Sequence, residues 1–429
     1  MSTPLPHCWH ESKLQAERVY GSLLKELENA RTIYVGGPRV NIDARMQPSG
    51  EAEFLCKLYP SLVFVDDGMA GETLFGKNII STKELAKKAS SADFLINCAL
   101  YYSGFNHFSR QTDSLGIPGC SVAEVLAAHH AKGIVMNFSG LTSVYGPAFH
   151  VHTFRHLEKY ASLRHHFYDK LSLRTFDNLI NYRLTGNQNF LYSIAVGHNY
   201  GTLRHDSYLL NAQFFTLSDN EVFIDAGAFD GESSKFFIES VNGKFDRVIM
   251  FEPFSESVQK CRATIDAMER IFPGSKDKIE IVEAGLYDRR GSLALSPTLF
   301  DQDVTERVGT KPNSAHLIDT GLSDAFVEKD NEYNIIQVPI VTLDECLNDG
   351  KDRCTLIKYE IEGSEVAALD GAKKTILNNK PKMALSIYHR PQDLELIIDY
   401  VTDLGLGYKM ALRAHNPWVP DAIVLYCWI

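Results

Sequence analysis

Short apolar runs alternate with helical patterns along most of this chain, and this alternation constrains the fold more than any other feature. Buried strands are predicted at "TIYVGG" (32–37), "LVFVDDG" (62–68), "NII" (78–80), "ADFLINCA" (92–99) and "GIVMNF" (133–138). An amphipathic helix is predicted over residues 12–30, and further helical patterns lie between some of the strands. Strands that alternate with helices predict a parallel sheet covered by helices. We therefore expect one α/β domain over residues 1–145.

A second alternation begins at Glu221 and predicts a second domain over residues 216–429. Strands are expected at 221–225, 247–251, 279–283, 355–360 and 383–387, and helices near 232–240, 255–270, 364–378 and 391–404. Residues 406–414 and 422–429 predict two strands whose seven-residue connection is too short for a parallel crossover, so this pair should be antiparallel. Residues 146–215 predict a helical bridge, and the polar residues 301–335 a long insertion or lid.

Length and composition limit the class of protein. A chain of 429 residues suggests two or three domains, since a domain has about 150 residues. The net charge of −11 argues against a duplex nucleic-acid binder, which needs a basic face. The eight cysteines form no C-x-x-C pair and no zinc-like spacing, which is typical of reduced thiols in a cytosolic protein. We expect a cytoplasmic protein without signal peptide, membrane span or metal site.

The stretch "VFIDAGAFDG" predicts a strand, then Asp225-x-Gly227-x-x-x-Gly231, then a helix. Ligands of open parallel sheets bind outside the carboxyl ends of the strands, where glycines let the backbone approach them. A glycine turn without a ligand is the alternative. The next strand, "RVIMFEP", ends in Glu252, which can accept hydrogen bonds from both hydroxyls of a ribose. Together these elements predict a nucleoside cofactor.

The charge of the glycine loop indicates which cofactor. A dinucleotide site has the pattern G-x-G-x-x-G and places pyrophosphate on a helix N-terminus. Here Asp225, Asp230 and Glu232 surround the glycines and would repel a pyrophosphate. They favour a cofactor with an ammonium and a sulfonium group, which is S-adenosylmethionine. A parallel sheet that ends in an antiparallel hairpin also fits methyltransferases better than dehydrogenases.

A second group of charged residues follows the predicted strand 355–360. In "IKYEIEGSE", strand alternation would place Lys358, Glu360 and Glu362 on one side, so the two acids should project together. They could bind a sulfonium, position a hydroxyl or hold a divalent ion; a capping acid and a solvated charge are the alternative. His389 follows the next strand, where a neutral imidazole could take the proton of the attacking oxygen. Lone histidines are usually structural, yet we assign these four residues to the catalytic set.

Residues from about 170 to 429 resemble the FkbM family of methyltransferases. The resemblance is carried by "LRTFDNLINYRLTG", "EVFIDAGAFDGESSKFF", "VIMFEP", "EAGLYDRRG", "IKYEIEGSEVAALDGAKKTI" and "LSIYHRPQDLELI". It implies O-methyl transfer from S-adenosylmethionine to a hydroxyl of a sugar, a polysaccharide precursor or a polyketide-like molecule. Gly285, in the fourth block, joins Asp225, Gly227, Gly231 and Glu252 in the predicted cofactor site. One residue departs from the family pattern, because Glu360 stands where an aspartate is usual.

The expected fold is therefore a C-terminal Rossmann-like methyltransferase domain with a smaller N-terminal α/β domain. The N-terminal domain is only loosely similar to nucleotide-binding domains, since "VGGPRVN" lacks a full phosphate fingerprint. Two other functions remain open at this point. One is a nucleotide-dependent oxidoreductase that uses the first domain, and the other is a cofactor-binding scaffold without turnover.

Overall fold

The computed structural model describes residues 5–42, 45–48, 50–98, 102–131, 147–185, 189–195, 214–297, 315–317, 336–415 and 422–429. The chain divides into two compact units, the first mainly residues 1–158 and 177–193, the second mainly residues 159–176, 194–298 and 312–429. The predicted domain boundaries at 145 and 215 stay a prediction. The strand predicted at 133–138 and all of the predicted insertion except residues 315–317 lie outside the described residues.

The first unit contains a six-stranded sheet with the order β5-β6-β4-β1-β7-β8. Its strands are β1 (Ile33–Gly36), β4 (Val63–Val65), β5 (Thr73–Leu74), β6 (Lys77–Ile80), β7 (Phe94–Asn97) and β8 (Gly119–Ser121), and β2 (Arg39–Ile42) and β3 (Arg45–Pro48) form a separate antiparallel pair. The pairs within β6-β4-β1-β7-β8 are parallel, and β5 pairs with β6 antiparallel. Strands β1 and β7 are buried at every residue, as the continuous apolar runs of the sequence predicted.

The helices of the N-terminal part are α1 (His7–Asn29), α2 (Gly50–Leu58), α3 (Thr82–Lys88), α4 (Tyr102–Leu115), α5 (Val122–Ala131), α6 (Pro147–Arg155), α7 (Leu157–Leu163), α8 (Lys170–Thr185) and α9 (Asn189–Ala195), with a 3₁₀ turn η2 (Arg164–His166). Helix α3 begins at a capping box, in which the Ser81 side chain accepts from the Glu84 N–H and the Glu84 carboxylate accepts from the Ser81 N–H. Helices α6 to α8 occupy much of the predicted bridge, and α8 is divided between the two units at residue 177.

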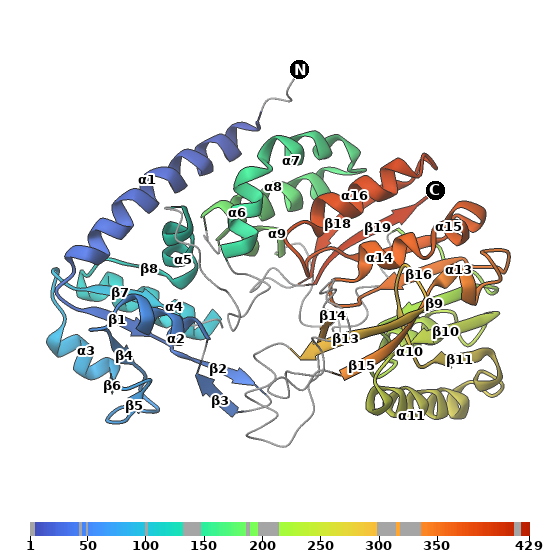
Figure 1. Cartoon of the computed structure of the whole chain (residues 1–429), viewed down its shortest axis with the longest axis horizontal. Coiled ribbons are helices and arrows are strands. Elements are labelled where there is room, and N and C mark those ends of the chain that lie inside the picture. The colour runs from blue at the N-terminus through green and yellow to red at the C-terminus, as the bar shows by residue number, and fades with distance from the viewer. Residues whose placement is uncertain are drawn as a thin grey trace. The chain divides into compact units, whose positions relative to one another are not determined.

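The second unit contains a seven-stranded sheet with the order β11-β10-β9-β16-β17-β19-β18 (Figure 1). The strands are β9 (Val222–Ala226), β10 (Arg247–Phe251), β11 (Ile279–Val282), β16 (Leu356–Tyr359), β17 (Lys382–Ser386), β18 (Lys409–Ala414) and β19 (Ile423–Trp428). The first five strands of this order are parallel, and β19 is antiparallel to both β17 and β18. The predicted parallel sheet with an antiparallel terminal hairpin is therefore confirmed.

Helices cover both faces of this sheet. They are α10 (Glu232–Ser240), α11 (Ser255–Ile271), α13 (Leu343–Cys346), α14 (Glu365–Asp370), α15 (Lys373–Asn379) and α16 (Asp393–Asp403), with a 3₁₀ turn η4 (Lys276–Lys278). Phe223 and Val248 pack against α10 and α11 in one core cluster, whereas on the other face Tyr359 donates a hydrogen bond to the Ala368 carbonyl of α14. In Figure 1, α11 and α14 accordingly lie on opposite sides of the strands.

Two features of the second unit differ from the prediction. The helix predicted over 364–378 is broken into α14 and α15 around Gly371, where a Cβ atom would lie 2.0 Å from the carbonyl oxygen of Tyr287. A further sheet with the order β12-β15-β13-β14 was not predicted; it contains β12 (Gly285–Leu286), β13 (Gly291–Pro297), β14 (Ala315–Leu317) and β15 (Ile336–Val341). Both differences depend on contacts with backbone from elsewhere in the chain, and local sequence patterns carry no information about such contacts.

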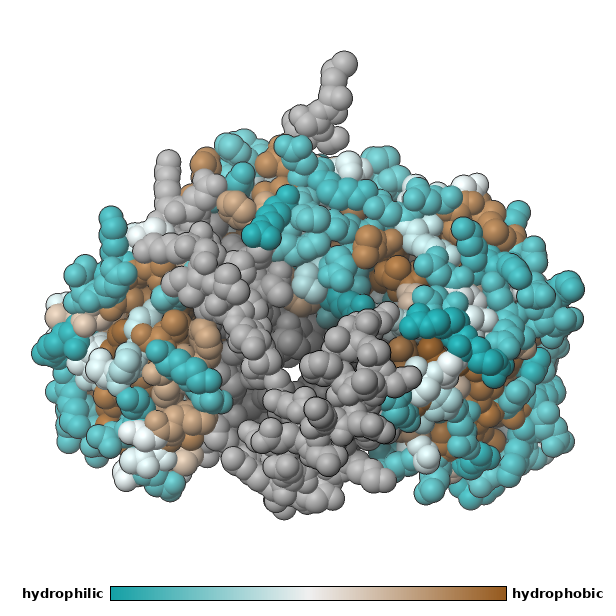
Figure 2. Space-filling view, in the orientation of Figure 1, coloured by the Kyte–Doolittle hydropathy of each residue, from teal (hydrophilic) through white to brown (hydrophobic). Residues whose placement is uncertain are grey.

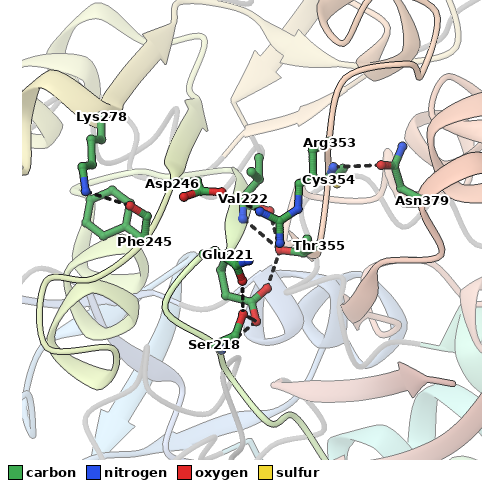
Figure 3. A network of polar contacts seen from close by, with 11 residues as sticks. Ser218, Glu221, Val222, Phe245, Asp246, Lys278, Arg353, Cys354, Thr355 and Asn379 are labelled. Atoms are coloured by element: carbon green, nitrogen blue, oxygen red, sulfur yellow. Dashed lines mark hydrogen bonds and ion pairs between the residues drawn. The ribbon is translucent and has the colours of Figure 1, made fainter.

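A network of polar contacts lies at the amino-terminal end of the main sheet (Figure 3). The buried Glu221 carboxylate accepts hydrogen bonds from the Ser218 and Thr355 hydroxyls, and Lys382 forms an ion pair with it. Thr355 also accepts a hydrogen bond from the Val222 N–H at 2.8 Å. These contacts tie β9, β16 and β17 together at the end opposite to the predicted cofactor site.

Hydrophilic side chains cover most of the described surface on the face that Figure 2 shows. Among the described residues, no helix is both long enough and apolar enough to cross a membrane. The mixed α/β class with mostly parallel strands, predicted from the sequence, is confirmed by the two large sheets.

Candidate functional site

The strand order of the main sheet reverses between β9 and β16. Ligands of open α/β sheets bind at such a point, outside the carboxyl ends of the strands. Asp225 lies near the carboxyl end of β9, Glu252 directly follows β10, and Glu360 directly follows β16. Because β10, β9 and β16 are parallel neighbours, these three carboxylates belong to one edge of the sheet.

Asp225 and Lys358 form a buried ion pair at this edge. They are register partners on β9 and β16, and Lys358 Nζ lies 3.0 Å from Asp225 Oδ1. Lys358 also donates to the Gly227 carbonyl at 2.8 Å, and the Ser234 hydroxyl donates to Asp225 Oδ2 at 2.6 Å. The Asp225 side chain is 0% exposed and the Lys358 side chain 3%, so both charges are shielded from solvent and stabilise the loop that follows β9. Lys358 is thus buried in an ion pair, and its predicted place in the catalytic set stays a prediction.

Both glycines of the loop have positive φ, 72° at Gly227 and 81° at Gly231. A Cβ atom at Gly227 would lie 1.9 Å from the carbonyl oxygen of Glu360, so only glycine lets the loop after β9 pass the loop after β16. At Gly231 a Cβ would lie 3.3 Å from the Thr264 side chain. Gly227 is thus required by chain packing, whereas Gly231 is favoured by its positive φ, in addition to any approach to a ligand.

Glu252 connects the two loops on its side of the sheet. Its Oε2 accepts a hydrogen bond from the Phe229 N–H at 2.9 Å, and its Oε1 accepts one from the Phe254 N–H at 3.0 Å. The residue is 4% exposed, and burial raises the pKa of its carboxyl. Each oxygen retains a second lone pair, so the predicted hydrogen bonds to a ribose stay a prediction.

Phe229 and Thr264 belong to this loop's environment and were missed by sequence reasoning. Phe229 has a positive φ of 51° and is 40% exposed, and Lys260 Nζ lies 4.9 Å from the centre of its ring. The Thr264 hydroxyl donates to the Asp230 carbonyl at 2.7 Å, which fixes the loop to α11. An aromatic residue inside a glycine loop was the available signal for Phe229, whereas Thr264 had none.

Gly285 lies on β12, in the small sheet, three positions after the end of β11. A Cβ atom there would have Ile340 Cγ2 at 3.7 Å, which is ordinary contact, so space does not require glycine at this position. Its predicted place in the cofactor site stays a prediction.

The loop after β16 differs from the predicted geometry. The strand ends at Tyr359, so strand alternation does not extend to Glu360 and Glu362, and Glu362 has a left-handed backbone with φ 55°. The Tyr388 hydroxyl donates to Glu360 Oε1 at 2.8 Å. Glu362 Oε2 instead lies 3.8 Å from Nε2 of His389, and its side chain is 36% exposed. The prediction that the two acids project together as strand neighbours is wrong.

His389 is buried among carboxylates. Its side chain is 2% exposed, and Nδ1 lies 2.9 Å from Oε1 of Glu365. Burial by itself lowers the pKa of His389, but the charges of Glu365, Glu362 and Glu360 outweigh it and raise the pKa to about 10. A protonated imidazole has no lone pair for a further proton. A raised pKa weighs against the role of a neutral general base, which stays a prediction, and the structure places His389 beside Glu362.

Glu365 and Asp393 complete this cluster and were not assigned to the site from the sequence. Burial opposes ionisation of Glu365, but the charge of His389 keeps the pKa of that carboxyl below its usual value. Burial and the charge of Glu365 raise the pKa of Asp393 to about 7, although its Oδ2 accepts a hydrogen bond from the Arg390 N–H at 2.6 Å. Both acids are close in sequence to predicted site residues, in "EIEGSE" and "HRPQD", but only the folded structure shows that their side chains lie together.

Comparison with known proteins identifies the domain that contains this site. Residues 225–410 match the family described as the methyltransferase FkbM domain. A crystal structure of methyltransferase FkbM from Methylobacillus flagellatus KT has a TM-score of 0.71 and 21% identity, covers 98% of this chain and 99% of its own, and at this identity shows the fold alone. A search of curated proteins finds no match.

Two other solved structures are more distant. An rRNA methylase from Streptococcus thermophilus has 13% identity and a TM-score of 0.28, covering 52% of this chain and 91% of its own. A protein from Streptococcus mutans in complex with SAH has 14% identity and a TM-score of 0.27, covering 52% and 95%. TM-scores this low carry no argument about this chain.

The family match confirms the methyltransferase domain predicted from the sequence, and with it S-adenosylmethionine as the cofactor that this domain implies. It also gives no support to the alternative of a nucleotide-dependent oxidoreductase. The match begins at Asp225 and ends within β18, so it spans the switch point and the His389 cluster alike. Residues 225–410 of this chain match the FkbM methyltransferase domain family.

Proposed function

We propose that this protein is an O-methyltransferase whose acceptor is a hydroxyl of a sugar, a polysaccharide precursor or a polyketide-like small molecule. The observation that carries the proposal is the carboxylate edge formed by β9, β10 and β16, which suits a cationic methyl donor and a reaction that releases a proton. Within it, Glu360 is half-buried and paired with the Tyr388 hydroxyl at 2.8 Å.

The residues of this edge fit S-adenosylmethionine. Glu252 would bind the ribose through its remaining lone pairs, and the loop from Gly227 to Gly231 would carry the rest of the cofactor past the end of β9. Gly285 stays within the predicted set. Acidic side chains favour the ammonium and sulfonium groups of this cofactor, which supplies an activated methyl group when bound. Asp225 and Lys358 act here as positioning residues, because their charges are paired and enclosed.

The side chains of the protein then need to contribute little to the reaction beyond positioning and proton removal. The site would have to hold the acceptor hydroxyl against the activated methyl group of the cofactor, and such positioning is worth up to roughly 7–11 kcal/mol in favourable cases. Methylation of a hydroxyl would release the hydroxyl proton. We propose that the Glu360 carboxylate accepts this proton and that Tyr388 orients the carboxylate. Glu362 and His389 would shape the same edge of the site.

The experiment is methyl transfer from cofactor with a ¹³C-labelled methyl group to a panel of sugars, sugar nucleotides and hydroxylated polyketides. The expected product carries the labelled carbon on oxygen, as read by NMR. Labelled carbon on nitrogen, on carbon or on RNA would refute the assignment of the acceptor. Binding of S-adenosylhomocysteine without transfer to any member would instead favour a scaffold without turnover.

A further inference from the structure

Three buried side chains from separate segments converge behind the rim of the candidate site. Glu365 is the first residue of α14, Asp393 the first residue of α16, and His389 lies between β17 and α16. One oxygen or nitrogen atom from each lies within 4.8 Å of the other two, and the residues are only 0%, 1% and 7% exposed. We propose that Glu365, His389 and Asp393 are the protein ligands of a divalent cation.

Two atoms of the cluster lack the hydrogen bonds that buried polar atoms normally make. Among the described residues, Glu365 Oε2 is buried without a hydrogen-bond partner, and His389 Nε2 has Glu362 Oε2 only at 3.8 Å, beyond hydrogen-bond distance. Such atoms are rare because each costs free energy when its partner is missing. The 2.9 Å separation of His389 Nδ1 and Glu365 Oε1 matches adjacent ligands of one ion, which lie about 3 Å apart when metal bonds are about 2.1 Å long.

The local charge also favours a cation. Negative charges of Glu360, Glu362 and Glu365 act on His389, and Asp393 is a fourth acid of the cluster. The charges of His389 and Arg390 act on Asp393 in the opposite direction. A divalent cation bound between Glu365, His389 and Asp393 would be attracted by the two buried carboxylates and would take a lone pair of the imidazole as its nitrogen ligand.

The ligand set indicates the class of ion. One imidazole nitrogen and two carboxylates suit Mn²⁺, Fe²⁺ or Zn²⁺, whereas Ca²⁺ and Mg²⁺ prefer oxygen ligands alone. Glu365 Oε1 also accepts a hydrogen bond from the Ile361 N–H at 3.0 Å, between Glu360 and Glu362. The ion would therefore hold α14, α16 and the end of β17 against the loop that carries both acids. No metal was predicted from the sequence, because these ligands follow no local spacing pattern.

The test uses the full chain, first dialysed against a chelator and then freed of it. Mn²⁺ is added, and the unbound ion is measured from its EPR signal. We expect one Mn²⁺ per chain with micromolar affinity, its displacement by Zn²⁺, and no displacement by equal Mg²⁺. At 100 times the dissociation constant, the melting temperature should rise by about 5 °C or more. Glu365→Gln and Asp393→Asn should each weaken uptake at least tenfold.

Two matched controls keep the result specific. Asp399→Asn removes one carboxylate from the same helix α16, where its partner is Lys159 at 2.7 Å. His156→Gln removes an imidazole outside the cluster, whose ring lies 4.0 Å from that of His152. Both should bind Mn²⁺ as the parent chain does.

Failure of the parent chain to take up Mn²⁺ or Zn²⁺ overturns the proposal, as does unchanged uptake in Glu365→Gln and Asp393→Asn. Loss of uptake in either control places the ion elsewhere and also overturns it. If a ligand variant does not fold by circular dichroism, His389→Gln replaces it with the same readouts. Because no readout is turnover, the result is independent of the proposed function.

Discussion

Lys358 and Asp225 pair across adjacent strands at the switch point of the sheet, with Nζ and Oδ1 3.0 Å apart and both side chains enclosed. Lys358→Met should therefore destabilise the second unit by roughly 3–5 kcal/mol, because it leaves a buried carboxylate without its counter-ion. Calorimetric unfolding measures this. Lys235→Met is the control, since the Lys235–Glu232 pair is more exposed and should contribute less than about 1 kcal/mol. Equal effects of the two substitutions would contradict the prediction.

Glu252→Ala should weaken binding of S-adenosylhomocysteine. The substitution removes two hydrogen bonds predicted to a ribose, each worth about 1.5–3 kcal/mol to a charged acceptor, and frees the Phe229 and Phe254 amides that it now holds. Isothermal titration calorimetry gives the dissociation constant. Glu256→Gln, an exposed acid in the first turn of α11, should leave it unchanged. An unaltered dissociation constant in Glu252→Ala would remove Glu252 from the cofactor site.

Glu360→Gln should lower turnover by roughly 10²–10⁴-fold if Glu360 takes the hydroxyl proton. It should also weaken binding of the cationic cofactor more than binding of its uncharged-sulfur product, because only the former loses a charge attraction. Tyr388→Phe removes the 2.8 Å hydrogen bond without changing the charge, so it should reduce turnover less. Single-turnover kinetics and calorimetry separate the two effects. Full activity in Glu360→Gln would transfer the base role to another group.

Gly227→Ala should be far more damaging than a strained backbone alone explains. The added Cβ would lie 1.9 Å from the Glu360 carbonyl oxygen, so the loops after β9 and β16 must separate. Gly274→Ala is a close control, because Gly274 also has positive φ, 86°, but has nothing within 4 Å of an added Cβ. The control should cost only about 1–2 kcal/mol. Similar melting temperatures for the two variants would show that loop contact is unimportant.

Acid should weaken the second unit partly through Glu221. Burial opposes its ionisation, but hydrogen bonds from Lys382 and Thr355 lower the pKa of the folded state below the usual value. Its contribution to stability is therefore present above the unfolded pKa of about 4.3 and is lost as pH falls through the folded pKa. Glu221→Gln should cost roughly 2 kcal/mol at pH 7, and this difference should shrink below about pH 4. Melting temperatures from pH 7 to 3 test it, and a constant difference across that range would exclude Glu221.

Much of the second unit could be predicted from local patterns. The runs 221–225 and 247–251 became β9 and β10 within one residue, because parallel strands buried on both faces are apolar throughout. The acid-glycine loop and the terminal hairpin likewise follow from neighbouring residues. Asp225, Glu252 and Glu360 could be placed at one edge of the sheet for the same reason, since each stands at or directly after the end of a recognisable parallel strand.

The environment of each site residue was decided only by tertiary structure. The sequence determined that a parallel sheet would carry acids and glycines at its carboxyl edge, since period and composition are local properties. The tertiary structure determined that Lys358 forms an ion pair with Asp225 and that Gly227 packs closely against the Glu360 carbonyl. It also determined that His389 lies within contact distance of Glu365. Burial and charge at a site depend on residues far apart in the chain, so the protonation state of His389 could not be predicted from its neighbours in sequence.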